Sequence, residues 1–424
     1  IRQFNPSAYI VWGGIHPIIQ PEDAIKHADA VCTGEGEFAF KKFLELYINK
    51  KDYTTAPSFW FNKDNNVIKN RNLPLMTPKE MDKLPPLMYE DGELVYHRNK
   101  GFMPLGTSQY LNYNGLQYCT VWSIGCPLMC TYCGNSKFIE YDNGYRRIRH
   151  SSPQTIIDEI LRAKSKQPHL STINFQDDSF LALPYEQLQD FAKLYKEQVK
   201  IPFVVCGVIP NYVREDKIAL LVDAGMNRVR MGIQSGSDNI LEFYKRPTKL
   251  HRIKEATEIL NKFRKYMIPP AYDIILENPV ENADDTRATV DMLYDMPRPY
   301  TINVYALRVI PNTLLAKDIE DRGLKVPPID KNYTTGYHRT LGNILVFALV
   351  VWKIPRWIFK ILRKKVYPVQ QKQASYPILF WLTRMTYLLK RAYHHLRFMD
   401  FSLLPGKPGY ILWKIGVIKF WQHF

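Results

Sequence analysis

Apolar runs and amphipathic stretches alternate along residues 116–310, with a repeat of roughly 30 residues. Short apolar runs bounded by Gly, Pro or Asp predict strands, and stretches with apolar residues three or four positions apart predict helices between them. The expected strands lie near 117–123, 172–177, 203–207, 228–233, 271–277 and 301–306. The expected helices lie near 153–167, 185–198, 213–224, 250–265 and 284–295.

Six strand–helix units in succession predict parallel strands joined by right-handed crossovers. The fold class is therefore α/β, and we expect residues 116–310 to form a partial (β/α)6 barrel related to the TIM barrel. In such a barrel the chemistry lies at the carboxyl ends of the strands.

The residues before the barrel show a different arrangement. Residues 8–50 alternate strand, turn and helix twice, which predicts the last part of a doubly wound, Rossmann-like sheet. Two such units are too few for a whole sheet, and the chain starts at Ile1, so we expect the domain to be truncated at its N-terminus. The expected domains are 1–50, a hairpin and linker over 51–115, the barrel over 116–310 and a mainly helical tail over 311–424.

Charge is concentrated in the last segment of the chain. Residues 331–424 hold 16 Lys and Arg and a single acid, Asp400, whereas the first 330 residues hold 41 basic and 40 acidic residues. Five of the eight tryptophans also lie in this segment. The body of the protein is thus nearly neutral, and the tail is strongly basic and aromatic.

The chain has six cysteines, too few for a disulfide scaffold. Three of them, Cys126, Cys130 and Cys133, fall within "SIGCPLMCTYCGN" directly after the first barrel strand. The other three, Cys32, Cys119 and Cys206, are expected to be small buried apolar residues. The clustered three predict a metal site: a structural zinc, with Cys119 or His150 as fourth ligand, or an iron–sulfur cluster with one iron left open.

The motif Cys126-x-x-x-Cys130-x-Tyr132-Cys133 resembles that of the radical SAM enzymes. The resemblance implies a 4Fe–4S cluster held by three cysteines, with the open iron chelated by S-adenosylmethionine. Reductive cleavage of this cofactor yields a 5′-deoxyadenosyl radical, and the reducing electron comes from a donor that the sequence does not name. Tyr132 matches the family position that lies against the adenine.

Four further cofactor contacts are implied by the same resemblance. Asp177 and Asp178 in "INFQDDSF" end the second strand, where a carboxylate suits the methionine ammonium, although an Asp pair also serves as a turn or helix cap. Gln234 and Ser235 in "MGIQSGS" match the stretch that meets the ribose or carboxylate, although a Gly/Ser-rich turn is the alternative. One departure is "DIILENPVEN" (273–282), which lacks the Gly-Pro-Gly-like turn that relatives commonly carry.

Residues 11–37 resemble the last part of the cobalamin-binding domain that precedes the barrel in one branch of the family. Cobalamin is therefore implied for a longer parent protein, with methyl transfer to an unactivated carbon as the usual reaction after hydrogen abstraction. Ring formation and rearrangement are the other known outcomes.

The tail interleaves basic residues with Trp, Leu and Ile, which is typical of helices at a membrane surface. Residues 341–352 are apolar but shorter than the ~20 residues that span a bilayer. We expect a cytoplasmic protein, peripheral at the inner face of the membrane, that acts on a small-molecule or lipid-like substrate. For the tail, the alternative is a helical cap packed on the barrel. For the function, the alternatives are a radical SAM enzyme that modifies tRNA and a zinc-stabilised, membrane-docking scaffold without enzymatic activity. The apolar character of the tail disfavours nucleic acid as a partner.

Overall fold

The computed structural model describes residues 1–63, 66–87, 92–324, 338–368, 371, 373–402, 404 and 406–422. These residues form two compact units, each assembled from separate stretches of the chain. The small unit contains the described residues of 1–84, 126–147 and 308–328. The large unit contains those of 85–125, 148–307 and 329–424. The division differs from the domain boundaries expected from the sequence because residues 126–147, which hold the cysteines, belong to the small unit.

The small unit is built on a four-stranded sheet in the order β1-β2-β3-β4. β1 and β2 are parallel, as expected for a doubly wound sheet, and β3 and β4 add an antiparallel hairpin in the region where one was predicted. The strands are β1 (Val11–Trp12), β2 (Ala30–Cys32), β3 (Phe59–Lys63) and β4 (Asn66–Lys69). The helices are α1 (Ile15–Ile19), α2 (Pro21–Ala24), α3 (Gly36–Ile48), α4 (Pro78–Met81), α6 (Asn135–Tyr141) and α13 (Leu314–Asp321), with 3-10 turns at Tyr53–Thr55 and Asn143–Arg146.

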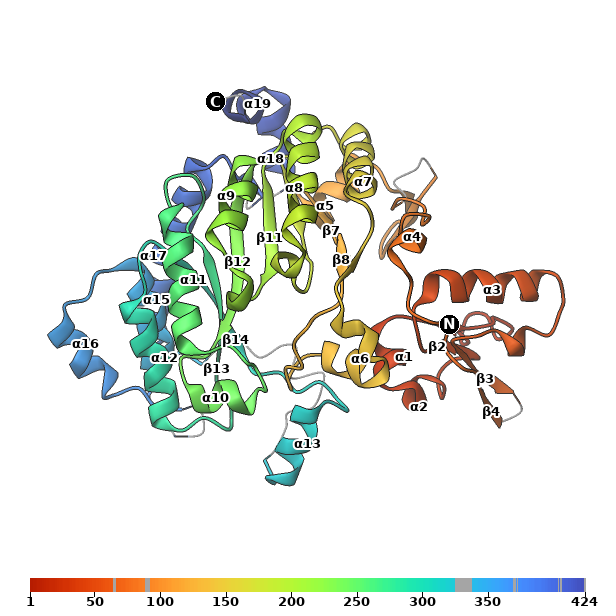
Figure 1. The fold of residues 1–424 in the computed structure, drawn as a ribbon, viewed down its shortest axis with the longest axis horizontal. Coiled ribbons are helices and arrows are strands. Elements are labelled where there is room, and N and C mark those ends of the chain that lie inside the picture. Colours follow the sequence, from red (N-terminus) through yellow and green to blue (C-terminus); the bar gives the residue numbers. More distant parts are fainter. Residues whose placement is uncertain are drawn as a thin grey trace. The chain divides into compact units, whose positions relative to one another are not determined.

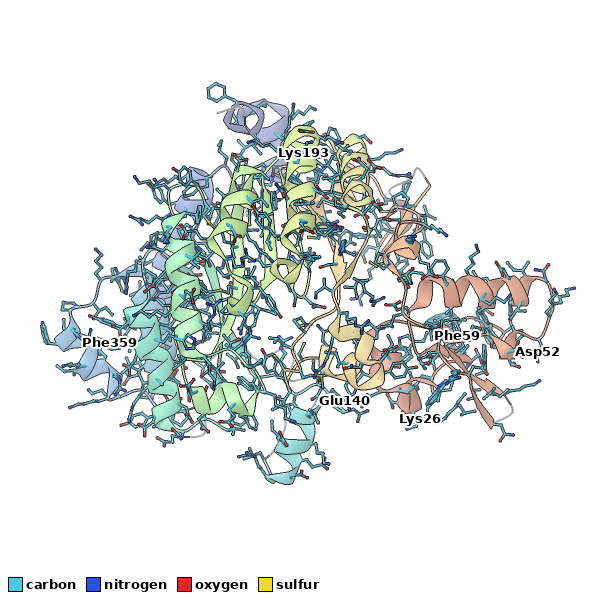
Figure 2. The ribbon with its side chains drawn as sticks, viewed as in Figure 1. Lys26, Asp52, Phe59, Glu140, Lys193 and Phe359 are labelled. Atoms are coloured by element: carbon cyan, nitrogen blue, oxygen red, sulfur yellow. The ribbon has the colours of Figure 1, made fainter. Side chains whose placement is uncertain are left out.

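Aromatic side chains form the core of this sheet. Phe43 of α3 stacks on Phe59 and Phe61 of β3 with ring centroids 5.2 and 6.0 Å apart, and all three are buried. Figure 2 places Phe59 among the side chains of this unit. Phe59 and Phe61 lie two positions apart on β3 and therefore point to the same face, which is buried against α3.

The large unit contains a six-stranded sheet in the order β7-β10-β11-β12-β13-β14, with every neighbouring pair parallel. The order follows the sequence, as the six predicted strand–helix units require. The strands are β7 (Gln117–Thr120), β10 (Thr172–Phe175), β11 (Phe203–Val208), β12 (Met226–Gln234), β13 (Ala271–Leu276) and β14 (Thr301–Ala306). All six lie at or within a few residues of their predicted positions.

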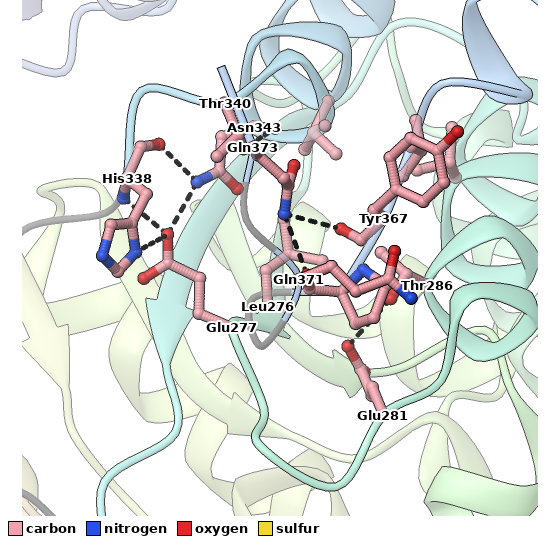
Figure 3. A pocket seen from close by; sticks show the side chains of 15 residues that line it. Leu276, Glu277, Glu281, Thr286, His338, Thr340, Asn343, Tyr367, Gln371 and Gln373 are labelled. Atoms are coloured by element: carbon pink, nitrogen blue, oxygen red, sulfur yellow. Dashed lines mark hydrogen bonds and ion pairs between the residues drawn. The ribbon is translucent and has the colours of Figure 1, made fainter. Parts of the chain in front are cut away.

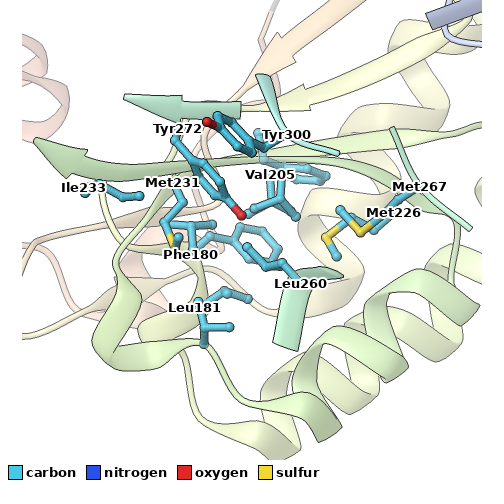
Figure 4. Close-up of a cluster of buried hydrophobic side chains, with 14 of the residues drawn as sticks. Phe180, Leu181, Val205, Met226, Met231, Ile233, Leu260, Met267, Tyr272 and Tyr300 are labelled. Carbon is cyan, nitrogen blue, oxygen red and sulfur yellow. The ribbon is translucent and has the colours of Figure 1, made fainter. Parts of the chain in front are cut away.

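Five long helices follow these strands and lie in a row along the sheet (Figure 1). They are α7 (Pro153–Lys166), α8 (Tyr185–Leu194), α9 (Glu215–Asp223), α11 (Leu250–Lys262) and α12 (Ala283–Asp295). Between sheet and helices lies an apolar core that includes Phe180, Met231 and Tyr272 (Figure 4). Two of these helices begin at residues that cap them. The Ser152 hydroxyl accepts from the backbone N–H of Thr155 to cap α7, and Asn282 forms a capping box with Asp285 at α12.

Smaller elements of the large unit were not predicted individually. They are the antiparallel pairs β5 (Leu94–His97) with β6 (Gly101–Pro104) and β8 (Ser123–Ile124) with β9 (Arg149–His150), and the helices α5 (Thr107–Asn114) and α10 (Asp238–Phe243). Short turns of 3-10 or π helix lie at Phe180–Ala182, Tyr195–Val199 and Pro210–Tyr212. The β5–β6 hairpin lies in the stretch expected to be a linker.

The tail is divided between the units: α13 belongs to the small unit, and the helices from Leu341 onward belong to the large unit, in part as the helical-cap alternative expects. They are α15 (Leu341–Val351), α16 (Arg356–Arg363), α17 (Pro377–Arg397), α18 (Gly406–Lys414) and α19 (Val417–Gln422). α15 is buried along nearly its whole length, and Phe380 and Tyr387 of α17 join the same core. Among the described helices, none combines the length and the apolar character needed to cross a lipid bilayer.

Candidate functional site

The three clustered cysteines lie on a loop of the small unit that leads into α6. Cys130 is buried, Cys126 and Cys133 are half-buried, and none of them forms a disulfide. The backbone N–H of Cys126 donates to the carbonyl of Tyr145 over 3.0 Å, and that of Cys133 donates to the carbonyl of Cys130 over 3.0 Å. The loop is therefore held by one backbone hydrogen bond within it and by one to the 3-10 turn at Asn143–Arg146.

Neighbouring residues of the small unit fix the same loop. Thr131, between two of the cysteines, is fully buried, and its carbonyl accepts from the backbone N–H of Leu315 at the start of α13 over 3.2 Å. The Ser136 hydroxyl donates to the carbonyl of Cys133 over 2.7 Å. Segments far apart in the sequence thus define the path of the cysteine loop.

The donor set fits an iron–sulfur cluster, because three thiols on one short loop are the ligands that such clusters take. In the part of the chain that the structure describes, no group of three or more His, Cys, Asp or Glu side chains is arranged so that it could hold a metal ion. The assignment of Cys126, Cys130 and Cys133 as ligands therefore stays a prediction from their spacing. The same holds for Tyr132, which is half-buried on this loop.

Asp177 and Asp178 differ sharply in their surroundings. β10 ends at Phe175, so both residues follow the strand; Asp177 is 2% exposed, whereas Asp178 lies at the surface. The carboxylate of Asp177 accepts hydrogen bonds from the backbone N–H groups of Trp122 and Ser123, at 3.2 and 2.6 Å, and from the Ser123 hydroxyl. Asp177 therefore joins the ends of β7 and β10.

The electrostatics of Asp177 follow from this environment. Burial raises the pKa of Asp177 to about 6, although the hydrogen bonds from Ser123 and Trp122 lower it. The carboxyl is therefore mainly ionised at pH 7. Its backbone is also close-packed: a Cβ on Gly207, whose φ is +64°, would lie 1.8 Å from the Asp177 carbonyl oxygen. Only glycine fits there.

Gln234 and Ser235 lie at the turn that ends β12. Gln234 has a φ of +76°, where the register with β13 shifts. Ser235 is fully buried; its hydroxyl lies 3.1 Å from that of Thr289 and accepts from the backbone N–H of Ser237. Ser237 in turn caps α10. The Gly/Ser-rich turn that was the alternative for this stretch is therefore present and leads into α10. The cofactor contacts of Gln234 and Ser235 stay a prediction.

The turn after β13 departs from the family pattern in a way that the structure explains. Glu277 has a φ of +58°, a conformation that glycine adopts most readily. Its carboxylate accepts from the backbone N–H of His338 at 2.5 Å and from the amide of Asn343 at 2.8 Å. Contacts to the tail thus hold an acidic side chain at a position where backbone strain would favour glycine.

Two findings were not foreseen from the sequence. Cys119 was expected to be buried and is exposed, because its neighbours Tyr118 and Thr120 point toward Glu159 of α7 and Cys119 points to the other face of the sheet; Cys32 and Cys206 are buried as expected. Glu281, four residues after Glu277, is 4% exposed in the large unit. The sequence gives no other indication of this burial than the position of Glu281 between a predicted strand and a predicted helix.

Comparisons with known proteins agree with the sequence motif. Residues 120–293 match the family described as the radical SAM superfamily. An uncharacterized methyltransferase of Pyrococcus horikoshii is 22% identical over 292 residues, 68% of this chain and 58% of the relative. An anaerobic magnesium-protoporphyrin IX monomethyl ester cyclase of Synechocystis is 24% identical over 268 residues, 62% of this chain and 49% of the relative. The chain thus spans about half to three fifths of these curated relatives.

Solved structures show the same fold. The radical S-adenosylmethionine methyltransferase TsrM from Kitasatospora setae aligns with a TM-score of 0.61 and 16% identity, over 77% of this chain and 61% of that one. The cobalamin-dependent S-adenosylmethionine radical enzyme OxsB aligns with a TM-score of 0.58 and 16% identity, over 100% of this chain and 64% of that one. At this identity the likeness establishes the fold.

Proposed function

We propose, on the premise that this chain belongs to the radical SAM superfamily, that it is an enzyme in which Cys126, Cys130 and Cys133 bind a 4Fe–4S cluster and the iron they leave open binds S-adenosylmethionine. The observation that carries the proposal is the three-cysteine motif within residues 120–293, the range that matches the family. When bound, this pair supplies a carbon radical that removes hydrogen from an unactivated carbon.

The chain's own residues bind and orient these groups. The cysteine loop, fixed through Thr131 and Ser136, presents the thiolates, and Tyr132 lies against the adenine. Asp178 is better placed than Asp177 to meet the methionine ammonium, because Asp178 is exposed, whereas Asp177 is 2% exposed and its carboxylate accepts hydrogen bonds from Trp122 and Ser123. Gln234, at the end of β12, contacts the ribose or carboxylate, and Ser235 supports that turn.

The reaction that follows hydrogen abstraction is proposed to be methyl transfer, with cobalamin as a second cofactor. Two observations support it: the fold is shared with TsrM and OxsB, and a bacteriochlorophyllide d C-8(2)-methyltransferase of Chlorobaculum tepidum is 23% identical over 323 residues. The electron comes from a reducing partner. Cyclisation is the second candidate, supported by the similarity to the magnesium-protoporphyrin cyclase.

A lipid-like substrate and a peripheral position at the inner face of the membrane are supported by the surface of the tail. Trp357 and Ile361 on α16, and Trp381, Leu382 and Leu389 on α17, are each more than half exposed. Basic residues lie between them in the sequence, which favours an anionic lipid surface over RNA. Part of this charge is used within the protein, since Arg363 pairs with Asp291 of α12 at 2.6 Å.

The test of the activity is reductive cleavage of S-adenosylmethionine. The protein is purified without oxygen, reconstituted with iron and sulfide, and assayed for 5′-deoxyadenosine with dithionite as electron donor. We expect product from the wild type and from Cys119→Ala, whose thiol lies on β7 and outside the cysteine loop, and none from Cys130→Ala. Stoichiometric zinc with no cleavage would favour the zinc-stabilised scaffold instead.

A further inference from the structure

A cavity of about 210 Å³ lies in the large unit where β13 ends. It is lined by the turn after β13, by α12 and α15, and by residues around Val366 and Gln371 (Figure 3). None of the predicted cluster ligands or cofactor contacts lines it. The cavity is therefore separate from the residues to which the sequence assigns chemistry.

Glu281 is the unusual group in its wall. Its side chain is 4% exposed and faces the cavity (Figure 3), and its Oε1 has no hydrogen-bond partner among the described residues. Its Oε2 accepts one long hydrogen bond, 3.4 Å, from the Thr286 hydroxyl. A buried carboxyl with an unused oxygen is costly, because it has lost its hydration without a replacement partner.

The charges around Glu281 are predominantly negative. Asp285 of α12 lies close enough to add to the effect of burial, and together they raise the pKa of Glu281 to about 8. Glu277 is already used, since it lies 3.1 Å from Nδ1 of His338 and accepts from Asn343. His338 therefore pairs with Glu277 and not with Glu281. Among the described lining residues, no Lys or Arg faces Glu281.

The rest of the wall is apolar and amide-rich. Val290 of α12, Val346 of α15 and Val366 supply aliphatic surface, and Gln371 and Gln373 supply amides. An apolar cavity of about 150 Å³ in another protein holds a benzene ring. The present volume therefore has room for one small ring, or an equivalent alkyl chain, and one polar group.

We propose that this cavity binds a small organic cation, a primary amine with an apolar body, whose ammonium group donates to Glu281 while the body packs against Val290, Val346 and Val366. The acidic surroundings disfavour an anion, and the unpaired Oε1 supplies the acceptor that an ammonium requires. On binding near pH 7, Glu281 releases its proton to solvent and an ammonium–carboxylate pair forms. The proposal goes beyond the radical chemistry and does not depend on it.

The test is titration calorimetry of the full chain with benzylamine at pH 7, with benzyl alcohol as the neutral comparison. We expect benzylamine to bind at least tenfold more tightly than benzyl alcohol, with uptake of a proton by the buffer. Glu281→Gln, which resembles the neutral carboxyl in shape, is expected to lose that preference. Glu258→Gln, at an exposed position of α11, is the matched control and is expected to keep it.

A second variant keeps the proposal testable if Glu281→Gln does not fold. Val346→Phe fills the cavity without changing its charge, and we expect it to abolish benzylamine binding while thermal unfolding remains cooperative. The proposal is overturned if the wild type does not bind benzylamine, if it binds benzyl alcohol equally well, or if Glu281→Gln or Val346→Phe binds benzylamine as the wild type does.

Discussion

At the scale of single residues, two adjacent aspartates have different tasks. Asp177→Asn replaces one acceptor oxygen by an NH2 group that faces backbone donors, so we expect a loss of about 1–3 kcal/mol in the free energy of unfolding. Asp178→Asn, at the surface, is expected to change it by less than about 0.5 kcal/mol and to weaken S-adenosylmethionine binding. Urea unfolding and equilibrium dialysis of the reconstituted protein measure the two effects. An Asp177→Asn protein as stable as the wild type would contradict the conclusion that Asp177 stabilises the fold by joining the ends of β7 and β10.

Glu281 gives the second residue-scale prediction, a dependence of stability on pH. Its pKa is about 8 in the folded protein against ~4.3 in an unfolded chain. Between these values the folded state retains a proton that the unfolded state has released, so stability falls as pH rises and levels off above about 8. The slope reaches at most about 1.4 kcal/mol per pH unit.

The measurement is the free energy of unfolding in urea at pH 6, 7, 8 and 9. We expect Glu281→Gln to show a flatter dependence than the wild type, because the amide does not titrate. Parallel curves for the two proteins would show that Glu281 titrates normally.

At the scale of elements, residues 331–424 are tied to the sheet through Asp400, the single acid in that range. Asp400 is buried and pairs with Arg228 of β12 at 2.9 Å and with His395 of α17 at 3.2 Å. Although burial alone raises a carboxyl pKa, the hydrogen bond from His395 and the charge of Arg228 hold the pKa of Asp400 well below its ordinary value. The stabilisation is therefore present above pH ~4 and is lost as pH falls toward the folded pKa.

We expect Asp400→Asn to lower the free energy of unfolding at pH 7 by about 3 kcal/mol, because it removes the opposite charge from the largely buried Arg228 guanidinium. The difference from the wild type should shrink in acid. Asp190→Asn, at an exposed position of α8, is the control in the same urea titrations. A variant that matches this control at pH 7 would show that the ion pair does not hold the tail.

The elements themselves were largely predictable, because their signals are local. β10, β11 and β14 read as apolar runs, the long helices between them have a regular apolar spacing, and α12 begins at a capping box. What could not be predicted depends on partners far apart in the sequence. The backbone donors that Asp177 serves lie more than fifty residues away, and the cavity beside Glu281 exists only because α15 packs near α12. The exposure of Cys119 likewise depends on which face of β7 packs against α7, about forty residues further along the chain.

At the scale of the whole molecule, the basic tail predicts binding to anionic membranes. We expect the protein to float with vesicles that contain phosphatidylglycerol at physiological salt, to float less at higher salt because the charges are screened, and not to float with phosphatidylcholine alone. A triple variant, Trp357→Ala, Trp381→Ala and Leu389→Ala, is expected to reduce flotation. Tyr266→Ala, an exposed aromatic outside the tail, is the control. If the triple variant floats as well as Tyr266→Ala, these tail residues do not mediate membrane binding.

The central claim is that three cysteines hold a cluster with one open iron. The most direct measurement is electron paramagnetic resonance of the reduced, reconstituted protein with and without S-adenosylmethionine, together with iron content. We predict close to four irons per chain, a 4Fe–4S signal that changes on addition of S-adenosylmethionine, and loss of both in Cys130→Ala but not in Cys119→Ala. A chain that holds zinc, or a cluster whose signal does not respond to S-adenosylmethionine, would contradict the claim.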